Sequence, residues 1–363
     1  MNILFTGGGT AGHTNPALAI AEGIKKKYPE ANIGFIGRAH GRENDLIKEA
    51  GFELFTLKIS GLSRTDLAKN FKIISEAVKA KKEASKIIKD FDADMVIGTG
   101  GYVCWPVIKS AKKLGIKTVI HESNTTLGLT TKLLMRDCNL FLVGNEITAK
   151  KYRNAIFTGN PLRDRFKYVP KNEAKKIMGI SPQKRLILSV GGSIGAKKLN
   201  EACLELMRNY SGISNDVCHL HSVGHRYYEE LKKTDYDLCI GKKECKAVAF
   251  INNMPIAMQA ADVIISRCGA MTLSEIAFCA LPSILVPSPN VAANHQMKNA
   301  MPFEERGAAI IINEDKLDGK ELEKNVKRIF SDSELIKKMQ KSAKSLSFPD
   351  STAKIIELIE NEL

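Results

Sequence analysis

The sequence predicts an α/β protein built from two Rossmann-like parallel-sheet domains. First, 363 residues are too many for one ordinary domain and enough for two, each able to bury a full core. Second, short apolar runs alternate with helical patterns along the chain, which is typical of parallel sheets covered on both faces. Third, one pattern, an apolar strand that enters a glycine turn and opens a helix, occurs at residues 3–12 and again at 186–196.

These two glycine turns indicate the kind of ligand. Glycine lets a backbone approach a diphosphate closely, and the N–H groups at the following helix N-terminus favour negative charge. We therefore expect two nucleotide-fold domains that face one cleft and can receive a phosphorylated ligand on either side.

The remaining elements follow in order. The boundary between the domains is expected at Thr158–Pro161, where glycine and proline interrupt the pattern, and Phe348–Ser351 is expected to form a turn that starts a last helix with apolar Ile355, Ile356, Leu358 and Ile359. After the opening strand, the expected strands are Ile33–Ile36, Leu54–Leu57, Met95–Ile97, Thr118–Ile120, Leu140–Val143, Leu186–Val190, Val217–Val223, Ala247–Phe250, Val263–Ser266 and Ser283–Val286.

Composition indicates a soluble globular protein, with 44% hydrophobic and 26% charged residues. The opening apolar run has no basic region before it and turns directly into glycines, so we interpret it as a strand and not a signal peptide. No stretch approaches the roughly 18 apolar residues of a membrane span. The eight cysteines show no metal-ligand spacing, which favours reduced thiols in the cytoplasm.

The net charge of +14 favours an anionic partner. Residues 60–90 contain eight Lys or Arg and four acidic residues. In the same segment, apolar residues recur at helical spacing: Leu67, Phe71, Ile74 and Val78. Such a segment can lie on an anionic bilayer, or it can be an ordinary surface helix whose apolar stripe packs on the sheet. The sequence shows no nucleic-acid motif, so nucleic-acid binding is not expected.

The first glycine turn permits two interpretations. Residues 7–12 satisfy G-x-G-x-x-G, which would suit a nicotinamide enzyme, but the next strand ends at Arg38 without an acid for a ribose diol. Arg38 could instead suit a 2′-phosphate, so an NADP-dependent oxidoreductase is one alternative. His13 follows the turn directly, either as a general base at the mouth of the cleft or as a residue that caps the helix.

Six blocks, taken together, give a more specific indication. The blocks are Gly8-Gly9-Thr10-Ala11-Gly12-His13, Gly100-Gly101-Tyr102, His121-Glu122-Ser123-Asn124, Gly159-Asn160-Pro161-Leu162-Arg163, Gly191-Gly192-Ser193-Ile194-Gly195-Ala196 and Gly269-Ala270-Met271-Thr272-Leu273-Ser274-Glu275. They occur in the order and spacing of the MurG family, which the chain resembles over nearly its whole length.

The resemblance implies a GT-B fold and a defined reaction. MurG enzymes transfer N-acetylglucosamine (GlcNAc) from UDP-GlcNAc to the 4-hydroxyl of the N-acetylmuramoyl sugar of lipid I, an undecaprenyl-diphosphate-linked precursor, giving lipid II in peptidoglycan synthesis. It implies an acceptor and membrane-facing domain over residues 1–161, a UDP-GlcNAc domain over 162–346, and a C-terminal helix, 347–363, that returns to the N-terminal domain.

For the donor, the resemblance places Phe250 and Ile251 beside the uracil, Glu275 on the ribose and Gln296 on the GlcNAc hydroxyls. Without it, Glu275 could equally be a first-turn helix residue and Phe250 a core aromatic. Ser193 and a helix N-terminus would contact the diphosphate; the residues that open this helix are Ala270, Met271, Thr272, Leu273 and Ser274.

For the acceptor, the resemblance implies a loop with Thr10, Ala11 and Gly12, and two candidate catalytic residues, His13 and Asn124. Only His13 can take a proton near neutrality. Arg163, the glycine loop and the helix end could stabilise the departing UDP, so we expect inverting transfer without a metal ion and without a cofactor.

A polyprenyl acceptor stays in the bilayer, so the resemblance implies a peripheral enzyme on the cytoplasmic face of the cell membrane. The implied partners are UDP-GlcNAc, lipid I, the anionic membrane surface and other cell-wall synthesis proteins. With the family accepted, the Leu67–Val78 stripe is favoured as the membrane face. A non-catalytic peripheral lipid-binding protein is a second alternative, which would explain the basic segment but not a histidine and an arginine at a cleft.

Overall fold

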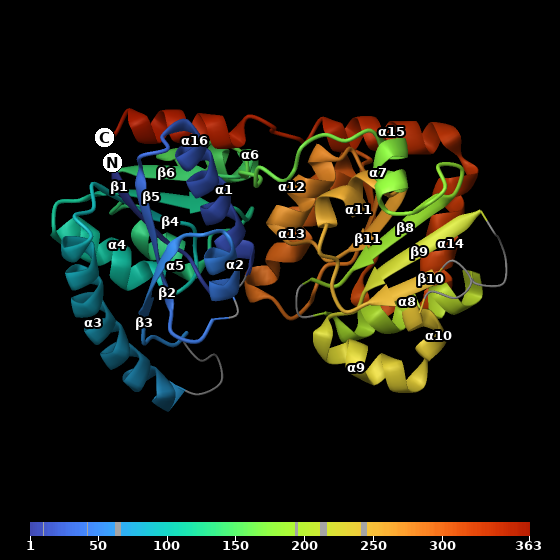
Figure 1. Cartoon of the computed structure of the whole chain (residues 1–363), viewed down its shortest axis with the longest axis horizontal. Coiled ribbons are helices and arrows are strands. Elements are labelled where there is room, and N and C mark those ends of the chain that lie inside the picture. Colours follow the sequence, from blue (N-terminus) through green and yellow to red (C-terminus); the bar gives the residue numbers. More distant parts are fainter. Residues whose placement is uncertain (10, 42, 62–66, 193–194, 211–215, 241–244) are drawn as a thin grey trace. The chain divides into compact units, whose positions relative to one another are not determined.

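The chain forms two compact units (Figure 1). A computed structural model describes residues 1–9, 11–41, 43–61, 67–192, 195–210, 216–240 and 245–363, without the side chains of residues 11, 43, 67–74, 210 and 240. Unit 1 comprises Met1–Asp164 and Phe348–Leu363, and unit 2 comprises Arg165–Ser347. Among the described residues, no helix combines the length and the apolar character that crossing a membrane requires.

Unit 1 contains a seven-stranded parallel sheet in the order β3-β2-β1-β4-β5-β6-β7. This is the doubly wound order, in which the direction of winding reverses between β1 and β4, and ligands bind beyond the carboxyl ends of such strands. The strands are β1 (Asn2–Thr6), β2 (Asn32–Arg38), β3 (Glu53–Leu57), β4 (Met95–Gly98), β5 (Lys117–Glu122), β6 (Leu140–Val143) and β7 (Ala155–Phe157).

Helices cover both faces of this sheet because successive residues of a strand point to opposite sides. Ile3 and Phe5 of β1 belong to one core cluster, and Leu4, between them, belongs to another. The first cluster includes residues of α1 and α16, the second residues of α3 and α4. The helices are α1 (Ala11–Lys27), α2 (Glu43–Glu49), α3 (Leu67–Asp90), α4 (Cys104–Lys113), α5 (Leu129–Leu134), α6 (Glu146–Lys151) and α16 (Ser351–Glu360).

Unit 2 repeats the plan with a six-stranded parallel sheet in the order β10-β9-β8-β11-β12-β13. The strands are β8 (Arg185–Val190), β9 (Val217–Ser222), β10 (Cys245–Val248), β11 (Val263–Ser266), β12 (Ser283–Leu285) and β13 (Ala309–Ile311). The helices are α7 (Lys171–Ile177), α8 (Lys197–Tyr210), α9 (His225–Thr234), α10 (Tyr236–Ile240), α11 (Met254–Ala260), α12 (Ala270–Phe278), α13 (His295–Glu305), α14 (Gly319–Ser331) and α15 (Ser333–Lys344).

The predicted fold class is confirmed. Each expected strand is present, and the final helix packs Ile355, Ile356 and Ile359 into the core of unit 1. Two edge strands, β7 and β13, were not predicted, and β10 ends at Val248, two residues before the predicted end at Phe250. The units divide after Asp164 and before Phe348, close to the expected boundaries after 161 and 346.

Candidate active site

In unit 1, the first glycine turn interlocks with a second turn. The two turns follow β1 and β4, the neighbouring strands at which the winding reverses. Gly8 N donates a hydrogen bond to Gly100 O at 3.3 Å. Gly101 has φ +86°, and a Cβ atom there would lie 2.0 Å from Gly8 O. Only glycine permits this approach of one backbone to the other.

The interlocked turns hold the imidazole of His13. Its Nδ1 atom lies 3.1 Å from Gly8 O. A carbonyl oxygen only accepts hydrogen bonds, so in the neutral ring Nδ1 carries the proton and Nε2 carries the lone pair. The ring rests on Gly100, where a Cβ would come within 2.7 Å of its Cδ2 atom. In the neutral form, His13 is therefore fixed as the Nδ1–H tautomer.

The same turns weaken the NADP interpretation. Gly8 N, an N–H group that a dinucleotide phosphate could use, donates instead to Gly100 O. Arg38, the residue proposed for a 2′-phosphate, donates from Nη1 to the Tyr102 hydroxyl at 3.3 Å. Both groups are therefore engaged by the protein itself.

Asn124 lies at the same edge of the sheet, just beyond β5. Its backbone N and its Nδ2 atom both donate to Glu122 Oε1, at 3.1 and 3.0 Å. Thr10 lies outside the described residues, as does the side chain of Ala11, so the structure does not place them. Gly12 lies in the first turn of α1, beside His13.

Arg163 is engaged within unit 1. Its Nε and Nη2 atoms contact Glu22 Oε1 of α1 at 3.0 and 2.5 Å, and its side chain is only 15% exposed. A role at the donor diphosphate requires this ion pair to open. Sequence reasoning did not identify Glu22, because the pairing joins residues 141 positions apart.

In unit 2, the second glycine turn packs closely on one side. A Cβ at Gly195 would lie 2.2 Å from Val223 O, just beyond the end of β9. A Cβ at Gly192 would have no atom of the described residues within 4 Å. Ser193 lies outside the described residues.

The N-terminus of α12 follows β11, the neighbour of β8. Gly269 is its N-cap residue, with extended backbone at φ −67° and ψ 139°. Met271 and Leu273 are buried, so they can reach a ligand only through their backbone N–H groups. The Ser274 hydroxyl donates to Ala270 O, and Thr272 is partly buried. The helix therefore offers N–H groups and its positive end to an anion.

Glu275 and Phe250 have unusual environments. Burial raises the pKa of Glu275 to about 7, and nearby Arg165 opposes this shift. Such a carboxyl, poised near neutrality, is typical of functional sites. Phe250 is 47% exposed and stacks on His225, with ring centroids 6.3 Å apart, whereas Ile251 is buried. The exposed ring argues against the interpretation of Phe250 as a core aromatic.

Gln296 is oriented by the backbone. Its Oε1 atom accepts from Cys268 N at 3.2 Å and from Ser288 N at 2.8 Å, which leaves the amide NH₂ as the group it can offer a sugar. Asn299 donates to Cys268 O at 3.2 Å. Arg267 donates to the carbonyls of residues 286 and 287 and pairs with Glu314. Sequence reasoning missed Arg267, although it directly precedes the Cys268-Gly269 turn.

The Asp-x-Asp pattern, which can hold a divalent cation, occurs in two places in the sequence, away from the glycine turns. Asp92 and Asp94 precede β4, at the amino end of the sheet, and Asp94 Oδ2 accepts from Asn2 N at 2.7 Å. Asp235 and Asp237 lie at the junction of α9 and α10, and Asp235 pairs with Arg208 at 2.9 Å. Neither pair lies on the loops that carry the candidate donor residues.

The proposed membrane stripe is described only in part. The side chains of Leu67, Phe71 and Ile74 lie outside the description, while Val78 is 53% exposed. Two other apolar side chains, Leu129 and Leu133 of α5, are 60% and 55% exposed and one helical turn apart. Sequence reasoning did not identify this pair.

Two doubly wound units, one with an imidazole held between two glycine turns and one with a glycine turn beside a helix N-terminus, are typical of two-domain glycosyltransferases of the GT-B class. The chain matches the glycosyltransferase family 28 N-terminal domain over residues 3–142 and the family 28 C-terminal domain over residues 186–355.

The chain belongs to the MurG family. It is 39% identical to the UDP-N-acetylglucosamine–N-acetylmuramyl-(pentapeptide) pyrophosphoryl-undecaprenol N-acetylglucosamine transferase of Caldanaerobacter subterraneus subsp. tengcongensis, with 99% of each chain covered. It is 36% identical to the protein of that name from Listeria monocytogenes, again with 99% of each covered. The crystal structure of Acinetobacter baumannii MurG is similar, with a TM-score of 0.75 at 25% identity over 99% of each chain.

Proposed function

We propose that this protein transfers GlcNAc from UDP-GlcNAc to the 4-hydroxyl of the N-acetylmuramoyl sugar of lipid I, giving lipid II. The observation that carries the proposal is the 39% identity, over 99% of each chain, to relatives named for this transfer. The geometry around His13 supports the chemistry, because transfer to a sugar hydroxyl needs a base that is neutral before the reaction.

In this proposal, His13 Nε2 takes the proton of the 4-hydroxyl as its oxygen attacks C1 of GlcNAc. The new O4–C1 bond forms while the bond from C1 to the diphosphate oxygen breaks, and the electron pair leaves with UDP. Direct attack on an α-linked donor gives a β-linked product. The Gly8 carbonyl, which accepts from Nδ1, stabilises the imidazolium that forms.

The departing UDP develops negative charge that must be met by fixed donors. We propose that the N–H groups at the start of α12 and around Gly192 supply them, with Ser193, and with Arg163 once its pair with Glu22 opens. Glu275 would accept from the ribose hydroxyls, Phe250 and Ile251 would contact the uracil, and Gln296 would donate its NH₂ to a GlcNAc hydroxyl. These roles support transfer without a divalent cation.

The test is a transfer assay with purified protein, UDP-GlcNAc and a short-chain lipid I analogue, followed by mass spectrometry of the product. We expect a product heavier by one GlcNAc, β-linked, with full rate after exhaustive chelation. UDP-glucose and ADP-GlcNAc are matched donors that should react poorly. Absence of transfer with a soluble acceptor would contradict the proposed function, and a strict requirement for a divalent ion would contradict the proposed stabilisation of UDP.

We further propose that the protein works at the cytoplasmic face of the membrane as a peripheral enzyme. Exposed Val78 with the lysines of α3, and separately the exposed pair Leu129 and Leu133 of α5, support contact with a membrane surface. Each such lysine contributes about 1 kcal/mol near an anionic surface, and salt screens this term.

Vesicle partition tests this placement. Changing Phe71 and Ile74 together to Ser should lower binding to anionic vesicles even at high salt, whereas charge reversal at Lys69 and Lys72 should matter mainly at low salt. Turnover of a soluble acceptor should be nearly unchanged by either pair. Equal partition of the wild type and a folded double-Ser variant would show that the α3 stripe packs on protein instead.

A further inference from the structure

Glu122 is a buried carboxylate that is surrounded by hydrogen-bond donors. It is the last residue of β5 and is only 4% exposed. Its Oε1 atom accepts from Asn124 N and Asn124 Nδ2, at 3.1 and 3.0 Å. Its Oε2 atom accepts from Gly128 N at 3.1 Å and from the Thr131 hydroxyl at 2.7 Å. One side chain thus holds three points of the segment that runs from β5 into α5.

These partners determine what Glu122 can do. Backbone N–H and amide NH₂ groups only donate, and they face both carboxylate oxygens, so each oxygen serves as an acceptor. Removal of the carboxylate would leave buried N–H groups without their acceptor. Glu122 is therefore suited to hold the loop.

The carboxylate also determines which way the amide of Asn124 faces. Because the carboxylate only accepts, the NH₂ group of Asn124 must face Glu122, and the Oδ1 atom lies on the other side of the amide. Asn124 would then present an oxygen to a sugar hydroxyl, which can orient that hydroxyl by accepting its proton in a hydrogen bond.

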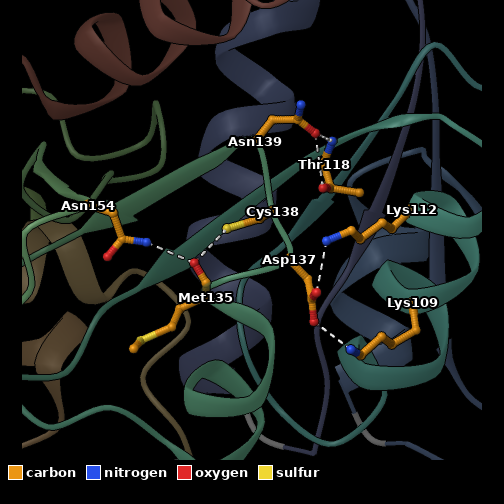
Figure 2. Close-up of polar contacts among 8 residues, drawn as sticks. All are labelled: Lys109, Lys112, Thr118, Met135, Asp137, Cys138, Asn139 and Asn154. Carbon is orange, nitrogen blue, oxygen red and sulfur yellow. Dashed lines mark hydrogen bonds and ion pairs between the residues drawn. The ribbon is translucent and has the colours of Figure 1, made fainter.

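The far end of α5 is anchored separately, as Figure 2 shows. Lys109 and Lys112 of α4 reach Asp137 at 2.5 and 2.8 Å. Asn139 accepts from Thr118 N at 2.9 Å, and Asn154 donates to Met135 O at 2.9 Å. The chain after α5 is therefore tied to α4 and β5 by contacts that do not involve Glu122. Within the loop, Asn160 Nδ2 and the Thr148 hydroxyl donate to Ser123 O and Thr125 O, at 3.3 and 2.9 Å. Loss of Glu122 should therefore release the side chain of Asn124 and the amides of Asn124 and Gly128, while the rest of the loop and α5 stay attached.

We propose that Glu122 is a positioning residue for the transfer reaction, which acts on the acceptor through Asn124. The inference rests on the proposed function, because Asn124 is taken to contact the acceptor. A sugar hydroxyl misplaced by about 1 Å can lower the rate of a positioned reaction by about 100-fold. The expected effect of Glu122 therefore falls on kcat for the acceptor and not on donor affinity.

A double-mutant cycle tests this. Glu122→Ala and Asn124→Ala should each lower kcat by about 100-fold, with UDP-GlcNAc affinity unchanged. The double variant should be no more than about threefold slower than Asn124→Ala alone, because the two residues act as a unit. Glu122→Gln keeps one acceptor oxygen, which can serve Asn124 at the expense of Gly128, and should retain part of the activity that Glu122→Ala loses. Effects that multiply to about 10⁴-fold in the double variant, or a folded Glu122→Ala variant with wild-type kcat, would overturn the proposal.

Asp137→Asn is the matched control, since it removes a carboxylate from the other anchor of α5 and should leave kcat unchanged. A second readout does not depend on activity: hydrogen exchange at the amides of Asn124 and Gly128 should accelerate in Glu122→Ala and not in Asp137→Asn. If the wild type transfers no sugar, the proposed function fails while the exchange data still decide whether Glu122 holds the loop. If transfer occurs and exchange at these amides is unchanged in Glu122→Ala, only the inference about Glu122 fails.

Discussion

The two glycine turns have similar sequences and equivalent places in their sheets, but their surroundings differ. Both follow the strand at which the winding reverses, β1 in unit 1 and β8 in unit 2. In unit 1, Gly101 packs against Gly8, and Nδ1 of His13 donates a hydrogen bond to the Gly8 carbonyl. In unit 2, a Cβ at Gly192 would meet no atom of the described residues within 4 Å.

The same sequence pattern can therefore either receive a phosphate or orient a side chain. An open turn lets a phosphate approach the backbone, which suits the donor. We propose that the first turn instead serves to fix a side chain. This proposal assigns the nucleotide to the second turn and the proton transfer to the first, and four measurements can test this division.

The largest expected effect is on chemistry at the first turn. His13→Ala should lower kcat by about 10²–10⁴-fold, because the attacking hydroxyl loses its base. Donor affinity should hardly change, since the donor is assigned to unit 2. Steady-state kinetics with saturating acceptor, together with calorimetry of UDP-GlcNAc binding, measure both. A kcat close to that of the wild type would show that His13 is not the general base.

The second test compares two glycines with the same backbone angle. Gly101 and Gly192 both have φ +86°, so alanine is strained at both by about 1–2 kcal/mol. Only at position 101 would the new Cβ meet backbone, at 2.0 Å from Gly8 O, which should add at least about 1–3 kcal/mol. Denaturant unfolding should therefore show a larger loss of stability for Gly101→Ala. Equal losses would mean that the first turn has more room than its geometry indicates.

The third test concerns the donor side. Glu275→Ala should weaken UDP-GlcNAc by about 1.5–3 kcal/mol, because the ribose hydroxyls lose a charged acceptor but are still desolvated. Calorimetry measures the change, and Asn124→Ala, in unit 1, serves as the control that should leave affinity unaltered. Unchanged binding in the Glu275 variant would place the ribose elsewhere.

The smallest effect is a pH dependence. With its pKa raised from 4.5 to about 7, Glu275 in the empty protein holds a proton below neutrality. Its contribution to stability is thus full below about pH 4.5 and is lost as the pH rises through 7. Donor binding needs the ionised carboxylate, so affinity should rise over the same range, by at most about tenfold per pH unit. Glu275→Gln should abolish both trends; a pH-independent wild type would contradict the shift.

Sequence patterns predicted the fold well because both sheets are parallel and their central strands are continuous apolar runs. The strands missed, β7 and β13, have only three residues each and lie at sheet edges. Phe250 was assigned to a strand because it is aromatic, but β10 pairs only with β9, and its last paired residue is Val248. A strand at an edge ends where its single partner ends.

The site was less predictable where contacts with residues distant in sequence determine how a side chain is oriented. Local sequence identified His13, but the contacts that set its tautomer come from Gly8 and from a turn almost 90 residues later. Similarly, nothing near Arg163 indicates that Glu22 neutralises it, and nothing near Gln296 indicates that two backbone N–H groups occupy its oxygen. Such pairings depend on the tertiary fold.

The return of α16 to unit 1 has a consequence for synthesis. Unit 2 is continuous in sequence, so it can finish folding on the ribosome once Ser347 has emerged from the exit tunnel. Unit 1 is the first to be translated but the last to complete its folding. Its core cluster contains Leu18 of α1 together with Ile355, Ile356 and Ile359 of the C-terminal helix. While unit 2 is being translated, the apolar surface of α1 that α16 later covers is open to solvent. A nascent chain halted before residue 351 should therefore be a chaperone substrate, although it already contains every residue assigned to either substrate.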